Sequence, residues 1–104
     1  MPLHALRIIS DVLYMITAAQ MRAARALLGI DQRELAELSG LSLPTVQRME
    51  ASEDVVRGTV DSLMKLIGAL NQAGIEIISE NTPSHGRGRG VRLISAAAES
   101  GLAP

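Results

Sequence analysis

With 104 residues the chain is long enough for one small domain, and because Tyr14 is its only aromatic residue the core must be aliphatic, which favours packed helices. The lack of Phe and Trp argues against single-strand nucleic-acid binding by base stacking, and the lack of cysteine excludes disulfides, thiolate nucleophiles and cysteine-containing zinc fingers. The formal net charge of −1 does not by itself indicate a nucleic-acid ligand, and the cysteine-free composition fits a cytoplasmic protein.

Residues 1–20 are expected to form an N-terminal helical extension. Apolar residues at positions 6, 9, 13 and 16 follow helical spacing, and a second row at 5, 8, 12, 15 and 19 widens the apolar face. That width indicates contact with a second chain, and packing on its own domain is the alternative. His4, Arg7 and Asp11 interrupt the apolar run, which excludes a membrane span, whereas a signal peptide remains an alternative because it needs only a shorter run.

Two short helices are expected next. Strong helix formers at residues 21–28 end at Gly29, which tolerates the positive φ of a helix C-terminus. Asp31, with Glu34 three residues later, forms a capping-box-like start for a helix over residues 32–39. The apolar face of this helix is expected to consist of Leu35, Ala36 and Leu38.

A third helix is expected over residues 43–51. Ser42 is a good N-cap, and Pro44 falls in the first turn, where its missing N–H is harmless. Val46 and Met49 would face inward, because they are three residues apart. The outward face would then carry Thr45, Gln47 and Arg48.

The C-terminal third predicts a fourth helix and a β-hairpin. Thr59 caps a helix whose apolar face has residues 60, 63, 64, 67 and 70 and which should end at Gly74. The β-favouring runs 75–79 and 91–95 flank a loop rich in Ser, Asn, Pro and Gly, which predicts a hairpin over residues 73–95 that could serve in dimerisation. Residues 96–104 are expected to be a flexible tail. The fold class is therefore mainly α: a small helical bundle with an N-terminal helical extension and a C-terminal β-hairpin.

The middle of the chain resembles the phage-repressor-like, XRE-type helix-turn-helix family. Two short helices around a Gly-containing turn are the physical basis of the motif, and the resemblance extends over residues 21–72. It is carried by Arg25, Gly29, Gln32, Leu35, Ala36, Gly40, Leu41, Ser42, Thr45, Val46, Arg48, Met49 and Glu50, in register and without a gap. The resemblance implies a compact helical domain whose helix at residues 43–51 enters the DNA major groove.

By this resemblance the residues that contact bases are Leu43, Pro44, Gln47 and Arg48. The first two depart from the commoner polar pattern, since their side chains could make only apolar contacts such as those with thymine methyls. Gln pairs bidentately with adenine and Arg with guanine, so sequence recognition is expected to depend on Gln47 and Arg48. The alternative for Arg48 is an exposed helix arginine paired with a neighbouring carboxylate.

The resemblance also assigns contacts with the DNA backbone. Gln32 would bond a phosphate at the start of its helix, with a solvated polar residue as the alternative, and Thr45 would contact the backbone as well. The remaining candidates for phosphate contact are Arg22, Arg33, Arg57 and Thr59. Arg25 and Glu50 match an ion pair with which the family joins its first helix to the end of the recognition helix, a structural role.

These features predict a sequence-specific regulator of transcription, with a repressor favoured, that binds a double-stranded DNA operator at the nucleoid. Residues 21–58 carry five arginines and six carboxylates, so two modules are needed on one duplex, and a homodimer is expected through the N-terminal helix or the hairpin. The alternative is a protein-binding module of the same fold, such as an antitoxin or antiactivator. No pattern indicates an enzyme, a cofactor or a metal site, and the basic loop at residues 86–90 is interpreted as a solubilising loop rather than a minor-groove arm.

Overall fold

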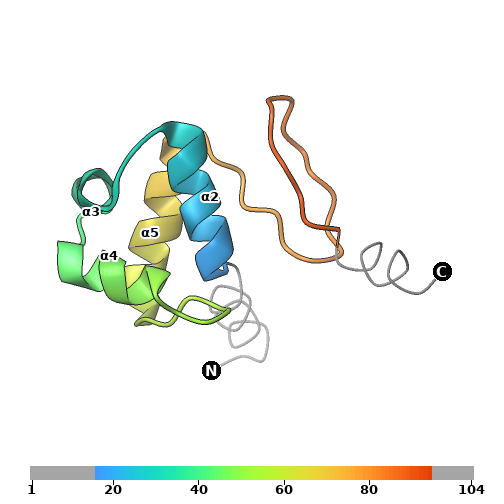
Figure 1. Ribbon diagram of the computed structural model, residues 1–104. Helices are drawn as coiled ribbons and strands as arrows, with labels where there is room; N and C mark the ends of the chain where they lie inside the picture. Colours follow the sequence, from blue (N-terminus) through green and yellow to red (C-terminus); the bar gives the residue numbers. More distant parts are fainter. Residues whose placement is uncertain (1–15, 95–104) are drawn as a thin grey trace, which may run out of the picture.

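The computed structural model describes residues 16–94, which form a small helical bundle followed by an extended segment (Figure 1). Four helices are present in this part of the chain. They are α2 (Ala18–Leu28), α3 (Gln32–Ser39), α4 (Leu43–Glu50) and α5 (Val60–Gln72). The mainly helical class is confirmed, whereas the helix expected before residue 16 and the tail at residues 96–104 lie outside the described residues. None of these four helices is long and apolar enough to span a membrane.

Two glycines set the sharp turns between the first three helices. Gly29 follows α2 with φ 68° and Gly40 follows α3 with φ 70°, the left-handed conformation that glycine adopts without a Cβ penalty. Between them, the Asp31 carboxylate accepts from the Glu34 backbone N–H at 2.8 Å, and the Glu34 side chain accepts from Asp31 N at 3.3 Å. The expected capping box and the expected cap at Gly29 are therefore present, and α3 begins after the N-cap Asp31 and ends at the C-cap Gly40.

The helix expected to end at Gly29 begins at Ala18. Thr17 is extended (φ −99°, ψ 163°), and its hydroxyl accepts from Gln20 N, which makes it the N-cap. The same stretch is joined to the loop before α5: Ala18 N donates to Asp54 O at 2.8 Å, and Val56 N donates to Ile16 O at 3.1 Å. The start of α2 is thus held by backbone hydrogen bonds from a distant part of the chain.

One apolar core unites the helices. Its fully buried side chains come from every helix and from Ile16, two residues before α2, and the largest are Ile16, Met21, Leu35, Val46, Met49, Leu63, Leu66 and Leu70. The inward orientation of Val46 and Met49 is confirmed. On α5 the expected face is rotated, because Leu66 is fully buried while Val60 and Met64 are exposed.

The apolar face of α3 also differs from the expected one. Leu38 is 49% exposed, and the neighbouring Ser39 is buried in its place. Ser39 tolerates burial because its hydroxyl donates to Leu35 O at 2.7 Å within the same helix, so no polar group is left without a partner.

The expected β-hairpin is not confirmed, because the structure contains no strand between residues 75 and 94. The chain leaves α5, runs outward and turns back (Figure 1), but the two runs are joined by a side chain, Arg92 Nη2 donating to Ser79 O at 3.1 Å, instead of a backbone ladder. Ile75 and Ile77 pack against the helical core, and Gln20 Nε2 donates to Ile78 O at 2.8 Å. Residues 75–78 are therefore positioned by their packing against the helical bundle.

Candidate nucleic-acid interface

Helix α4 has one face inside the protein and one face in solvent. Val46, Met49 and Glu50 are buried, whereas Gln47 and Arg48 are exposed. The turns at either end hold this orientation: Ser42 caps the N-terminus by accepting from Thr45 N, and Ala51 N donates to Gln47 O at the other end. The exposed residues lie on a helix whose rotation is fixed by its buried face, as a rigid reading surface requires.

A chain of hydrogen bonds runs along the exposed face of α4. Ser42 Oγ donates to Thr45 Oγ1 at 2.8 Å, and Arg48 Nη2 donates to the same oxygen at 3.2 Å. A hydroxyl oxygen that accepts two hydrogen bonds keeps its own hydrogen free for an outside acceptor. Thr45 therefore orients Arg48 and presents a donor of its own, and neither of the two ion pairs among the described residues involves Arg48.

The other residues expected at the interface lie in different environments. Pro44 is exposed, but Leu43 is half-buried and packs against the core, so only part of its side chain is available for an apolar contact. Gln32, the first residue of α3, is half-buried. The exposed backbone candidates are Arg33 at the start of α3, Arg57 in the loop before α5, and Thr59, the N-cap of α5.

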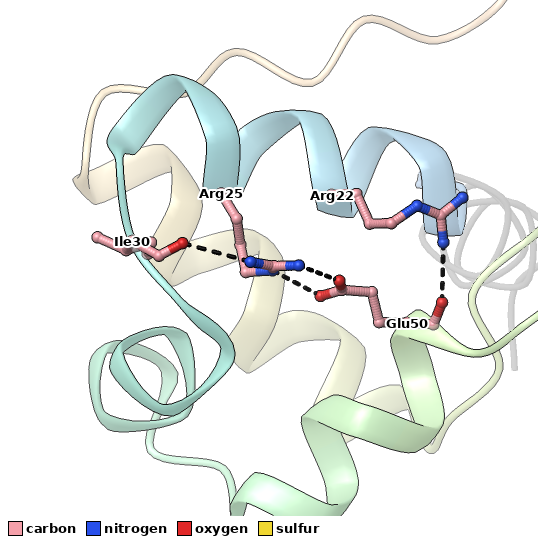
Figure 2. A network of polar contacts seen from close by, with 4 residues as sticks. All are labelled: Arg22, Arg25, Ile30 and Glu50. Atoms are coloured by element: carbon pink, nitrogen blue, oxygen red, sulfur yellow. Dashed lines mark hydrogen bonds and ion pairs between the residues drawn. The ribbon is translucent and has the colours of Figure 1, made fainter.

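Arg25 of α2 forms an ion pair with Glu50 at the end of α4 (Figure 2). Arg25 Nε donates to Glu50 Oε2 at 2.8 Å, Arg25 Nη2 contacts Oε1, and Arg25 Nη1 donates to Ile30 O at 3.3 Å. The hydrogen bond with Glu50 raises the pKa of Arg25 above its ordinary value, against the opposing effect of burial. Both side chains therefore have hydrogen-bond partners, and the ion pair joins α2 to the C-terminal end of α4.

A family model described as Helix-turn-helix matches residues 21–72, which is half of the chain. The chain belongs to the XRE-type helix-turn-helix family. This is a family of DNA-binding transcription regulators, and the match contains all of α3, α4 and α5 and most of α2. No curated protein and no solved structure matches the chain.

One hydrogen bond in this helix-turn-helix module, made by Arg22, was not predicted from the sequence. Arg22 Nη1 donates to the backbone carbonyl of Glu50 at 3.0 Å, so Arg22 and Arg25 bind the same residue, one through the main chain and one through the side chain (Figure 2). A cation at the C-terminal end of a helix complements its partial negative charge. Arg22 thus has a structural contact where a phosphate contact was expected, and the three-residue spacing from Arg25 was the available signal.

The near-neutral charge of the helix-turn-helix module is unevenly arranged. Glu50, the only carboxylate on α4, is buried and paired with Arg25, so Arg48 is the only charge on the solvent face of that helix. The N-termini of α3 and α5 carry the partial positive charge of unpaired backbone N–H groups beside Arg33 and Thr59. The solvent face of α4 itself therefore carries a single positive charge, whereas the N-termini of α3 and α5 also carry the carboxylates of Asp31, Glu34 and Asp61.

Proposed function

We propose that this helix-turn-helix protein binds a specific double-stranded DNA operator as a homodimer and represses transcription. The observation that carries the proposal is the division of α4, whose buried face is fixed to the bundle while Gln47 and Arg48 project from the other. The major groove admits such a helix and distinguishes all four base pairs. Operator binding would locate the protein at the nucleoid of the cytoplasm.

Base recognition is assigned to the outward residues of α4. Arg48 reads guanine through O6 and N7, and Gln47 reads adenine through N6 and N7, each pair worth about 1–3 kcal/mol of discrimination. Pro44 and the accessible part of Leu43 add apolar contact with thymine methyls. The hydrogen bond to Thr45 supports the role of Arg48, because it limits the positions that the guanidinium samples before binding.

Contacts with phosphates would set the position of α4 in the groove. Gln32 and Arg33 begin α3, and Thr59 caps α5, so all three lie at helix N-termini, where anions are favoured. Thr45 has a free hydroxyl hydrogen for the same purpose, and Arg57 is exposed in the preceding loop. Such contacts give affinity without sequence preference.

A homodimer is part of the proposal because one module is weakly charged. Residues 21–58 carry five arginines against six carboxylates, and one arginine, Arg25, is already paired with Glu50. Affinity for the DNA backbone depends on how many phosphates are neutralised, so two modules on one duplex double the small number available. The half-sites would lie about 34 Å apart, one helical turn of DNA.

The proposal is tested by selecting bound fragments from genomic DNA at low salt and measuring gel retardation of the selected sequence. A retarded complex is expected that unrelated DNA does not compete away, and Arg48→Ala should abolish the preference at one base pair in each half-site. Failure to retard any sequence preferentially would refute the function. Unchanged specificity in Arg48→Ala would refute the assignment of Arg48 alone.

Exposed apolar residues after α5 favour a second candidate, a protein-binding module such as an antitoxin or antiactivator. Val91 is 81% exposed and Leu93 is 87% exposed, more than an isolated regulator requires. This candidate predicts a stable complex with a different protein and no preference among DNA sequences. Co-purification with the products of neighbouring genes, together with gel retardation, separates the two functions.

A further inference from the structure

A groove of about 670 Å³ lies between α2 and the segment that follows α5. On one side are the outer residues of α2, including Ala19, Ala23 and Leu27, and on the other side are residues 75–80 and 91–93. We propose that this groove is the homodimer interface, in which residues 91–94 of a second copy replace the chain's own residues 91–94 as a β-strand beside residues 75–79. The exchange is reciprocal about a two-fold axis.

The backbone N–H groups beside the groove are open to strand pairing, whereas the carbonyls of Ile78 and Ser79 already accept hydrogen bonds. None of the backbone N–H groups of residues 76–79 or 87–94 donates a hydrogen bond to another described residue. Residues 77–79 are nevertheless half-buried, and buried main-chain groups require partners. An extended segment with a free edge is the usual template for strand addition.

The proposed strand is apolar and unusually exposed. Val91, Leu93 and Ile94 are 81%, 87% and 61% exposed, and Leu27 on the facing helix is 55% exposed. Four extended residues span about 13 Å at roughly 3.3 Å each, and α2 from Ala19 to Leu27 spans about 12 Å at roughly 1.5 Å per residue. The strand and the helix wall therefore match in length as well as in polarity.

The charges beside the groove identify a second copy as the occupant. The charged residues that line the groove are three carboxylates, those of Asp54, Glu76 and Glu80, and one arginine, Arg92, whereas residues 81–94 contain no carboxylate and carry Arg87, Arg89 and Arg92. The two ion pairs among the described residues involve none of these groups. A second copy would bring its basic segment against this acidic wall and receive the same contact in return, as an isologous interface requires.

Arg92 and residue 80 set the register of the added strand. Within one chain Arg92 Nη2 reaches Ser79 O at 3.1 Å, so the Arg92 guanidinium lies beside the residue that precedes Glu80. Strand exchange would keep that position and place Arg92 of each copy beside Glu80 of the other. The inference rests on the proposed function in one respect, because that function requires a dimer. The groove itself contains no residue of α4.

The decisive experiment uses two charge reversals in the full chain, Arg92→Glu and Glu80→Arg. Each variant alone places like charges in both contacts of a homodimer, so its dimer dissociation constant should rise at least ~10-fold by sedimentation equilibrium. An equimolar mixture places opposite charges in both contacts and should form the heterodimer, detected by native mass spectrometry. Monomers in that mixture would overturn the proposal, because they would indicate that residues 91–94 pair only within their own chain.

Leu93→Glu tests the apolar contact, with Met64→Glu as the matched control on the outer face of α5, where Met64 is 58% exposed. Only Leu93→Glu should raise the dimer dissociation constant, again at least ~10-fold, with unchanged helical circular dichroism. Equal effects of the two variants, or an unmodified protein that stays monomeric or dimerises regardless of the groove variants, would overturn the proposal. A groove-dependent dimer that binds no DNA would instead refute the proposed function and leave this interface standing.

Discussion

Arg25 and Glu50 form a bidentate ion pair whose two members are buried to different degrees. The Glu50 side chain is 4% exposed and that of Arg25 is 22% exposed, so the carboxylate depends on its partner more than the guanidinium does. Arg25 also retains a second acceptor, Ile30 O, at 3.3 Å. Removing either side chain therefore leaves behind a different unpaired charge.

This asymmetry predicts unequal losses of stability. Arg25→Ala leaves a buried carboxylate unpaired and should lower the free energy of unfolding by about 3–5 kcal/mol, the cost of breaking a buried pair. Glu50→Ala should cost less, because Arg25 can be solvated and keeps its bond to Ile30. Urea unfolding of both variants and of the double variant measures the coupling. Equal losses that simply add would contradict the pairing.

Arg22 should contribute to stability, in contrast to Arg33. Arg22→Ala removes the hydrogen bond to Glu50 O and should cost about 0.5–1.5 kcal/mol. Arg33→Ala is the matched control, because the Arg33 side chain is exposed and makes no hydrogen bond or ion pair with another described residue. Arg33→Ala should leave thermal unfolding unchanged but reduce the salt dependence of DNA binding by about one unit of slope. A loss of stability in Arg33→Ala, with a reduced salt dependence in Arg22→Ala, would contradict these two assignments.

Thr45 should affect DNA recognition beyond its own contact. Thr45→Val keeps the shape of the side chain but removes the oxygen that accepts from Arg48. We expect weaker overall binding from the lost phosphate contact, together with a reduced preference at the base pair that Arg48 reads. Thr45→Ser restores the oxygen and should restore the preference. Binding isotherms on operators that differ at that base pair measure both effects, and a uniform loss would mean that Thr45 does not orient Arg48.

The turn glycine and a helical glycine should respond to alanine in opposite ways. Gly40 has φ 70°, so Gly40→Ala should cost about 1–2 kcal/mol from left-handed strain, although no atom obstructs the added Cβ. Gly68 lies inside α5 with open space around its Cβ position, so Gly68→Ala should stabilise the protein by about 0.5–1 kcal/mol. Thermal denaturation of both variants distinguishes backbone conformation from packing.

Glu76 should organise the loop after α5 in a pH-dependent way. Its carboxylate accepts from Ser84 Oγ at 2.6 Å, from His85 N at 2.7 Å and from Gly86 N at 3.2 Å. The Ser84 bond first, then the bond from His85, lowers the pKa of Glu76. These contacts should be complete above the ordinary Glu pKa of about 4.3 and be lost as the pH falls through the lower folded value. The amide resonances of His85 and Gly86 should report that titration, and Glu76→Gln should remove it.

The module could be predicted in detail because its boundaries are local. Asp31 with Glu34, Gly40 and Ser42 act on backbone groups within a few residues, so their positions in the sequence determine where helices begin and end. The side of α4 that faces solvent followed from the spacing of Val46 and Met49. These features need no knowledge of the rest of the chain.

The errors came both from contacts between distant residues and from a hydrogen bond within one helix. Leu66 replaced Met64 in the core because the rotation of α5 is set by the helices against which it packs, and Ser39 replaced Leu38 because a hydroxyl can be satisfied within its own helix. The bond from Arg22 to Glu50 joins residues 28 positions apart. Helical spacing places two residues on one face but does not say which partner that face will meet.

The backbone hydrogen bonds of Ile16 and Ala18, together with the N-cap Thr17, define a minimal folding unit larger than the family match over residues 21–72. A fragment cut at Met21, where that match begins, would lose the N-cap Thr17, the buried side chain of Ile16 and the partner of Val56 N. Together the cap and the buried isoleucine are worth about 2–4 kcal/mol, a large share of the stability of so small a domain. Fusions and truncations of this protein should therefore begin before Ile16. A fragment that starts at Met21 should unfold locally at the N-terminal end of α2.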